Sequence, residues 1–517
     1  MNYIKNITKV FIFLLAISSA KAQEIVELKL PQSDKVIIKL MFRNGSIADP
    51  VGKEGITELA ASVVEGGGTA TMTQQQINEK IYPWAASYGV NTDKEVTVFT
   101  FQVPSVFLDQ FYPILEGLIL TPSFATTDFD RVKRNQQNYV DEVIRSASDE
   151  EYSKKALENM LFRGTNYAHL TSGNSQSVKS ITLEDVKTHY KNVFAKNNLT
   201  IGIAGKYSAE FLSKLKSDLG ALPTLKSPIP VAGKANRPDG INIEIISKDN
   251  ALGSAVFGGF PFPITRSDND FAAMMVANSW LGEHRKSYSR LYEKIREQRS
   301  MNYGDYSYIE WYESGGGNML PVSGVPRSSN YFSFWLRPVQ TAKGLKGQYS
   351  ELSSIETGHA HFAVRMVLKE MDLLIQNGLS EKDFNLTRDF LRSYIKLYIE
   401  SPNQQLGYLM DSHFYGRKDY ITEVGKLLEK LTLSDVNNAI KKYWQTKNMD
   451  IVIVTDKSEA APLAKSFQNG LVSPMSYSNS LKSSLPATIL EEDKVVEKYP
   501  MPVKSVTIIE SDNVFRK

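Results

Sequence analysis

The sequence predicts an α+β fold built from two duplicated domains, each an antiparallel-rich sheet packed with helices. In each half, segments with strand-like alternation come first and long helical segments follow, an order typical of α+β rather than doubly wound α/β proteins. The two halves repeat each other, and a proline-rich joint separates them. At 517 residues, 42% of them apolar, the chain is long enough to build several cores.

In the first half, alternating apolar and polar residues predict strands at residues 36–42 and 95–101. Helices are expected at residues 105–120 and 127–146, where apolar residues recur at helical spacing. A further strand at residues 199–204 is expected to close this half.

The repeat consists of blocks that occur in the same order in both halves, the longer ones 250 or 251 residues apart. The matching blocks are 128–129 with 383–384, 181–190 with 431–436, and 196–203 with 447–454. Thr182 and Thr432 occupy equivalent places and are candidate helix N-caps. A repeat this long indicates duplicated domains rather than a solenoid.

Domain limits follow from composition. Pro223, Pro228, Pro230 and Pro238 predict a linker at 223–240 between domains at 23–222 and 241–457. Residues 458–517 are expected to form a C-terminal connection and tail. Within this tail, residues 458–486 are rich in Ser and Asn and predict a mobile connection, whereas residues 505–509 predict a last strand docked on one of the sheets.

The N-terminus predicts a signal peptide at residues 1–22. Lys5 and Lys9 precede a short apolar run at 10–17, and an Ala-x-Ala site at 20–22 follows. The run is too short to span a bilayer, so we expect no transmembrane anchor and a secreted, periplasmic protein. A retained anchor helix is the competing interpretation.

Charge and cysteine content exclude several classes of protein. Beyond residue 22 the chain holds 57 basic and 57 acidic residues, so overall charge gives no case for nucleic acid or an anionic membrane as a partner. With no Cys, neither a disulfide nor a lipidated cysteine can form. Two of the six histidines, His359 and His361, lie two apart; on a helix they diverge by about 200°, so we interpret them as surface or helix-start residues.

The segment 55–69 is an amphipathic helix that stops at Gly66-Gly67-Gly68, where glycines are expected to adopt left-handed conformations. With the preceding segments 43–46 and 49–55, it resembles the entry to the zinc helix of the pitrilysin/insulinase (inverzincin) metallopeptidases. The resemblance covers nearly all of residues 24–456 in order and motifs. It implies two inverzincin-like domains that form half of a clamshell.

In that family a His-x-x-Glu-His helix binds zinc through two histidines on one face, and the Glu activates water. Here the three positions are occupied by Glu58, Ala61 and Ser62. Ala61 cannot act as a base, and neither Glu58 nor Ser62 replaces an imidazole pair. Glu142 matches the family's third ligand. The resemblance therefore implies a degenerate site that lacks catalytic residues and a metal, with Glu142 as a vestige.

The second half carries a more specific likeness. Arg296 and Tyr303 have the spacing of an Arg/Tyr pair that contacts substrate beside the zinc in the family. A guanidinium fork and a phenol hydroxyl suit a peptide carbonyl or an oxyanion. Gly315, Gly316 and Gly317 resemble the glycine-rich loop of the non-catalytic subunits of mitochondrial processing peptidases. The alternatives are an ordinary helix-end arginine, a core tyrosine and a wide hairpin turn.

Together these features predict the non-catalytic, substrate-binding subunit of a secreted heteromeric zinc metallopeptidase that acts on peptides. Zinc and the intact helix would belong to a homologous partner chain, and Arg296 and Tyr303 would complete that partner's active site. One alternative is a stand-alone peptide-binding or scaffold protein without a proteolytic role. A third interpretation is an independent enzyme that uses Glu58 and Glu142 with an unusual metal.

Overall fold

A computed structural model describes residues 24–312 and 319–515 of the chain. The predicted signal peptide, and the loop containing Gly315, Gly316 and Gly317, lie outside the described residues. No helix in the described ranges combines the length and the apolar character needed to cross a membrane.

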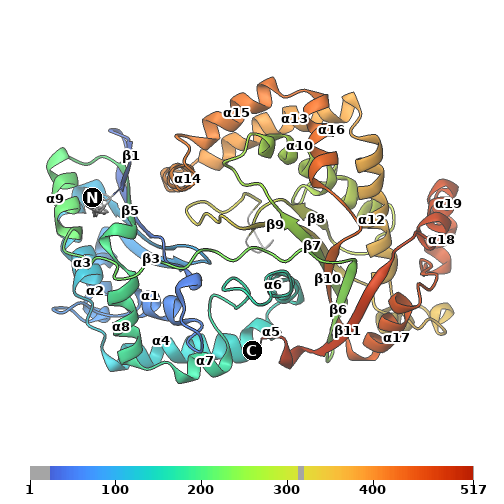
Figure 1. Cartoon of the computed structure of the whole chain (residues 1–517), viewed down its shortest axis with the longest axis horizontal. Coiled ribbons are helices and arrows are strands. Elements are labelled where there is room, and N and C mark those ends of the chain that lie inside the picture. Colours follow the sequence, from blue (N-terminus) through green and yellow to red (C-terminus); the bar gives the residue numbers. More distant parts are fainter. Residues whose placement is uncertain (1–23, 313–318, 516–517) are drawn as a thin grey trace, which may run out of the picture.

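The first half is built on a five-stranded sheet, which lies on the left in Figure 1. Its strands, in spatial order, are β1 (Glu24–Lys29), β5 (Leu199–Gly205), β2 (Lys35–Phe42), β4 (Thr97–Pro104) and β3 (Ser87–Thr92). All neighbours are antiparallel except β1 and β5. Its helices are α1 (Ile56–Glu65), α2 (Gln74–Ile81), α3 (Leu108–Leu120), α4 (Thr126–Asn138), α5 (Ile144–Ser146), α6 (Asp149–Leu161), α7 (Ser175–Ser180), α8 (Leu183–Val193) and α9 (Ala209–Leu219).

The second half is built on a six-stranded sheet. Its strands, in spatial order, are β11 (Val503–Glu510), β6 (Ile241–Lys248), β10 (Met449–Asp456), β7 (Ser254–Phe262), β9 (Asn330–Val339) and β8 (Asp305–Tyr308). Its helices are α10 (Asp270–Gly282), α11 (Ala342–Gln348), α12 (Ala360–Asn377), α13 (Glu381–Tyr394), α14 (Pro402–Phe414), α15 (Tyr420–Lys430), α16 (Leu433–Tyr443), α17 (Lys457–Gln468), α18 (Asn479–Ser484) and α19 (Ala487–Val496).

The two sheets share one topology, which confirms the predicted duplication. The order β1-β5-β2-β4-β3 recurs as β6-β10-β7-β9-β8, and β11 is added at the outer edge of the second sheet. The first two strands in this order are parallel in both sheets: β1 with β5, and β6 with β10. The predicted caps are also confirmed: Thr182 begins α8 and Thr432 begins α16, each in a reciprocal capping box with the Asp three residues later.

Each sheet is covered on one face by its own helices and on the other by a helix from the opposite half. α14 of the second half packs on β5 and β1, where Leu406 and Met410 meet Ile37 and Met41 of β2. In return, α6 of the first half packs on β7 and β10 of the second sheet. Figure 1 shows both helices between the two halves. This exchange explains why the central strands are apolar on both faces.

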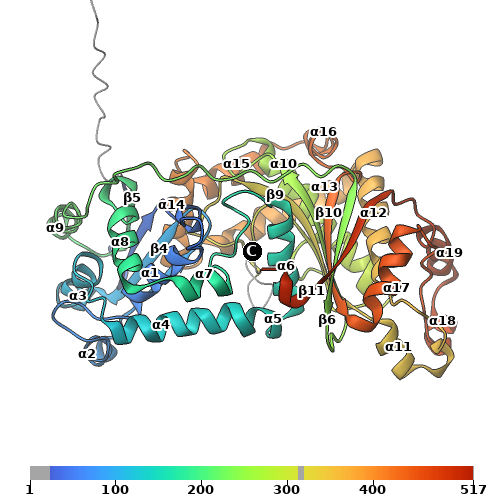
Figure 2. The ribbon, with the colours of Figure 1, turned by 60° about the horizontal axis from the view of Figure 1, so that its bottom comes forward.

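The connections between the halves are also held in place. The predicted linker has no helix or strand between Leu219 and Ile241, and it crosses between the halves in Figure 2. Its backbone is fixed to the end of α6, because the Asn236 amide donates to the Leu161 carbonyl at 2.7 Å.

One expectation for the second half is corrected. Residues 458–486 are not a mobile connection throughout, since they contain most of α17 and all of α18. Leu463 and Phe467 of α17 are buried at helical spacing, a signal that the Ser and Asn content obscured. Of the two interpretations of His359 and His361, the helix-start one is confirmed, because His359 caps α12 and His361 lies in its first turn. Both are buried rather than on the surface, and His361 Nδ1 lies 2.8 Å from Ser466 Oγ of α17. The expected final strand is β11, parallel to β6.

Candidate functional site

Helix α1, the zinc-helix equivalent, is positioned at its N-terminus by Asp49. The Asp49 carboxylate accepts hydrogen bonds from the amides of Gly55 at 2.7 Å and Thr57 at 2.9 Å. These amides are among those that a helix N-terminus leaves without intrahelical partners. Gly55 has a φ of 92°, and a Cβ there would lie 2.5 Å from the Ser172 carbonyl oxygen. Only glycine therefore fits at the entry to this helix.

The C-terminus of α1 needs glycine for a different reason from the one expected. Gly66 has a φ of −85°, and none of the three glycines is left-handed. A Cβ on Gly67 would instead lie 2.5 Å from the Val63 carbonyl oxygen, and one on Gly68 would lie 2.4 Å from the Met72 carbonyl oxygen. The glycine run is required by close backbone approach.

The three degenerate positions separate into two environments. Glu58 and Ser62, four residues apart on one face of α1, both line a cavity between the two halves. Ala61 is fully buried in the core of the first half. The helix thus still presents two polar side chains where the family has its histidines, while the position of the catalytic Glu is part of the core.

The cavity has a volume of about 360 Å³ and polar walls. Its lining comes from α1, β3 and the turn after it, Tyr139, α6 and the loop that follows α6, together with two residues of the second half, Trp311 and Arg327. Because both halves contribute, the cavity exists only when they are packed together.

The expected third ligand does not join this site. Glu142 is exposed and lines separate depressions near Arg145 and Asp512, whereas Tyr139 lines the cavity with Glu58. Residues Tyr139–Val143 form a π-helical segment between α4 and α5. A π-helical turn takes more residues than an α-helical one, which changes the side chains that face α1. Sequence spacing alone could not reveal this change.

A cluster of buried charges closes one side of the cavity. The Arg327 guanidinium donates two hydrogen bonds of 2.6 Å to Asp93 and one of 2.5 Å to Glu158 of α6. Lys94 lies 2.9 Å from the other oxygen of Glu158. All four residues are buried. Burial acts to raise the pKa of Glu158, but the two cations outweigh it and hold that pKa well below its usual range.

Two charged groups on the cavity wall have no such partner. Within the described residues, neither the Glu58 carboxylate nor the Lys155 ammonium of α6 forms a hydrogen bond or an ion pair. Burial raises the pKa of Glu58 to about 7, although the positive charge of Lys155 opposes the shift. For Lys155, burial acts to lower the pKa, but Tyr139 and the carboxylates of Glu158, Glu151 and Glu58 raise it overall.

The predicted substrate-binding pair lies in the second half, outside the lining of this cavity. Arg296 belongs to the π-helical segment Tyr292–Glu297, where its guanidinium lies 5.8 Å from the Tyr292 ring and 3.5 Å from Glu297. Tyr303 is 79% exposed, just before the edge strand β8. Within the described chain no hydrogen bond engages the Tyr303 hydroxyl, so it is free to contact another molecule.

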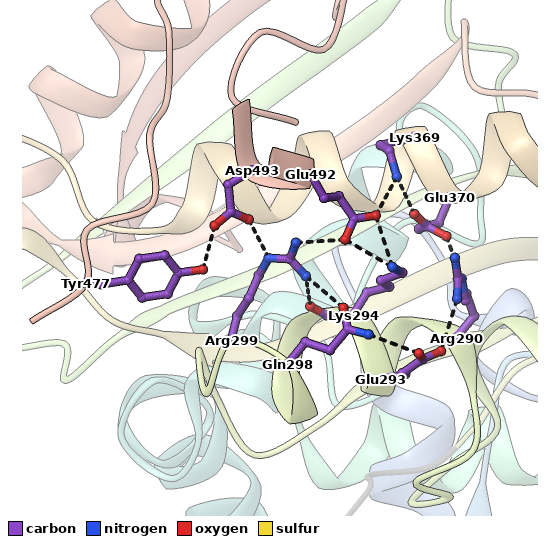
Figure 3. A network of polar contacts seen from close by, with 10 residues as sticks. All are labelled: Arg290, Glu293, Lys294, Gln298, Arg299, Lys369, Glu370, Tyr477, Glu492 and Asp493. Atoms are coloured by element: carbon purple, nitrogen blue, oxygen red, sulfur yellow. Dashed lines mark hydrogen bonds and ion pairs between the residues drawn. The ribbon is translucent and has the colours of Figure 1, made fainter. Parts of the chain in front are cut away.

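The segment carrying Arg296 is anchored by a network centred on Arg299 (Figure 3). The buried Arg299 guanidinium binds Asp493 at 2.8 Å and Glu492 at 2.9 Å, both on α19. Lys294 and Lys369 lie 3.0 and 2.9 Å from Glu492. Burial acts to raise the pKa of Glu492, but these three cations lower it to about 2. The network is completed by Arg290, Glu293, Gln298, Glu370 and Tyr477. Helix α19 thus fixes the segment from which Arg296 projects.

Two family models match the chain: Insulinase (Peptidase family M16) at residues 24–174, and Peptidase M16 inactive domain at residues 180–391. The chain belongs to peptidase family M16. A Helicobacter pylori protein named non-peptidase homolog YmxG is 24% identical over 455 residues, which cover 86% of this chain and 96% of that protein. The Arabidopsis thaliana protein "Probable mitochondrial-processing peptidase subunit beta" is 24% identical over 226 residues, 43% of this chain and 41% of that protein.

Solved structures share the fold of this chain. The crystal structure of a peptidase M16 inactive domain from Pseudomonas fluorescens has a TM-score of 0.70 at 19% identity, covering 84% of this chain and 96% of that one. The present chain is an M16 member whose zinc helix carries no histidine. Across residues 24–312 and 319–515, no group of three or more His, Asp and Glu side chains is arranged to hold a metal.

Several residues that line this cavity carry no signal in the sequence that identifies them as site residues. Asp93 and Lys94 stand between two apolar strands, and charged residues there ordinarily indicate an exposed turn. Glu158 and Lys155 lie three residues apart on α6 and predict a solvated helix face. Arg327, the partner of Asp93 and Glu158, lies far along the chain, so only the packing of the two halves brings these residues together.

The first prediction concerns the charge cluster. Arg327→Met should lower the free energy of unfolding by about 3–5 kcal/mol, because Asp93 and Glu158 would keep buried charges without their main partner. Urea denaturation followed by circular dichroism measures the loss. Arg134→Met, at an exposed arginine of α4, is the control and should change stability by less than about 0.5 kcal/mol. Equal effects of the two substitutions would contradict the role of the cluster.

The second prediction concerns Glu58. Its folded-state pKa of about 7 lies above the ordinary value of 4.5, so the native state keeps a proton that the unfolded state has lost. Stability should therefore fall as the pH rises between these values. Glu58→Gln removes this titration, so its stability relative to the unsubstituted protein should increase by up to about 3 kcal/mol from pH 4.5 to 7.5.

Denaturation at both pH values checks the Glu58 prediction. Glu184→Gln, at an exposed glutamate on α8, is the matched control and should show no such gain. A Glu58→Gln effect that is the same at both pH values would show that Glu58 titrates normally.

Proposed function

We propose that this chain is the non-catalytic, substrate-binding subunit of a heteromeric zinc peptidase, and that it supplies Arg296 and Tyr303 to the active site of a homologous partner. The proposal rests on the contrast between two motifs, the zinc helix in the first half and the Arg296/Tyr303 pair in the second. The zinc helix has lost both histidines and the base, whereas the Tyr303 hydroxyl remains exposed, on a segment that the Arg299 network holds in place.

The chemistry of the pair supports this role. A phenol hydroxyl and a guanidinium are hydrogen-bond donors suited to the oxyanion that forms when a peptide bond is attacked. Donors on this chain that act beside another chain's zinc must be exposed, as Tyr303 is. The similarity to a protein named as a subunit of a processing peptidase is consistent with assembly. Export to the periplasm is part of the proposal and rests on residues 1–22.

A second candidate is a stand-alone binding protein without a proteolytic role. The observation that favours it is the cavity between the halves, which has polar walls and two charged groups without partners. Co-purification with a chain that carries an intact His-x-x-Glu-His motif separates the two candidates, since a stand-alone binder would be recovered without it.

The third prediction concerns metal. The chain purified alone should bind no stoichiometric zinc, because Glu58 and Ser62 replace the imidazoles and Glu142 lines separate depressions. Elemental analysis by plasma mass spectrometry after dialysis measures the zinc content. A content near one zinc per chain would instead favour an independent metalloenzyme.

The fourth prediction concerns catalysis by the mixed complex. Tyr303→Phe removes one hydroxyl and should lower turnover by on the order of a hundredfold, the usual cost of losing an oxyanion donor. Arg296→Ala should act similarly and also raise KM, since the guanidinium grips the peptide as well. Hydrolysis of a fluorogenic peptide by the assembled complex is the measurement.

Matched substitutions keep this test specific. Tyr82, 85% exposed in the first half, and Arg134, exposed on α4, provide Tyr82→Phe and Arg134→Ala as controls that should leave turnover unchanged. None of the four substitutions should lower the melting temperature by more than a few degrees. Full activity of a correctly assembled Tyr303→Phe complex would remove the active-site role.

A further inference from the structure

The charged residues that line the cavity fall into two groups. One group is internally paired: Arg327 and Lys94 bind Asp93 and Glu158, and Lys154 binds Glu151 at 2.8 Å. The other group consists of Glu58 on α1 and Lys155 on α6. In the part of the chain that the structure describes, these two make no ion pair with any residue or with each other. The cavity wall therefore carries one carboxyl group, that of Glu58, and one ammonium group, that of Lys155, without a direct partner.

Each group lacks a direct partner and is partly buried. A partly buried charge loses some of its hydration, and proteins often compensate it with a partner. The two groups sense each other's field, since Lys155 lowers the pKa of Glu58 and Glu58 raises that of Lys155. They come from different helices, α1 and α6. A bound molecule with one positive and one negative group would compensate both.

Neutral polar groups complete the wall. Thr92 Oγ1 is buried without a hydrogen-bond partner in the described chain. Asn91, Ser62 and Tyr139 also line the cavity, and none of their side chains is engaged in a hydrogen bond among the described residues. These groups offer donors and acceptors to a polar ligand. A volume of about 360 Å³ lies at the small end of the 300–1,000 Å³ typical of small-molecule sites.

We infer that this cavity binds a small zwitterion, a free amino acid or a dipeptide, with its ammonium at Glu58 and its carboxylate at Lys155. A simple anion would engage only Lys155, and a simple cation would engage only Glu58. The inference goes beyond the proposed subunit role, because it requires neither a partner peptidase nor zinc.

The test uses the full-length chain purified alone and three ligands measured by isothermal titration calorimetry. Dialanine carries both charged ends, N-acetyl-dialanine lacks the ammonium, and dialanine amide lacks the carboxylate. Dialanine should bind, and each capped form should bind about ten- to a hundredfold more weakly, the usual cost of one charge-assisted hydrogen bond.

Two variants assign the ends of the ligand. Glu58→Gln should weaken dialanine binding tenfold or more and abolish discrimination against the N-acetylated form, while still discriminating against the amide. Lys155→Met should also weaken dialanine binding, but it should abolish discrimination against the amide while still discriminating against the N-acetylated form. The matched surface controls Glu184→Gln and Lys216→Met should behave like the unsubstituted protein. Circular dichroism and the melting temperature verify that each variant is folded.

The outcomes separate cleanly. Weaker binding of both capped forms, with the discrimination reversed between the two variants, supports the inference. Three results overturn it: no dialanine binding at millimolar concentration, equal binding of capped and uncapped ligands, or unchanged ligand discrimination in both folded variants. Because no peptidase partner is present, none of these results depends on the proposed subunit role.

Discussion

The arginine at position 327 holds the two halves of the molecule together by charge as well as by packing. Its guanidinium reaches from the second half into the first, where Asp93 follows the edge strand β3 and Glu158 lies on α6. A buried arginine offsets its loss of hydration only when its N–H donors are hydrogen-bonded and the oxygens of its acidic partners are also engaged. The geometry meets this condition, since Lys94 takes the remaining oxygen of Glu158.

Helix α6 links the charge cluster around Arg327 to the cavity. One side of the helix packs on β7 and β10 of the second sheet, while Glu158 joins the charge cluster and Lys155 lines the cavity beside α1. The equivalent exchange by α14 has a different result: there Asp411 is engaged by Arg266 at 3.0 Å. Both exchanged helices therefore carry a buried carboxylate bound by an arginine, Glu158 on α6 and Asp411 on α14.

Prediction from the sequence was accurate where structure depends on residues that are close together in the chain. Strand alternation located β2 and β5, and the Thr432 capping box followed from residues three apart. It failed where a local pattern was ambiguous. The Ser and Asn content of residues 458–486 concealed helix α17, and one π-helical segment placed Tyr139, rather than Glu142, at the cavity. No spacing rule based on α-helices accounts for such an insertion.

The sequence by itself determined the α+β class, the duplication, the family resemblance and the absence of histidines from the zinc helix, because each is written in residue identity or short-range periodicity. Only the tertiary structure decided which charges are paired. Asp93 and Arg327 are separated by 234 residues, and whether a buried group finds a partner depends on how α6 and the opposite sheet pack. Consequently Glu58 and Lys155 are recognisable as unpaired only in the folded chain.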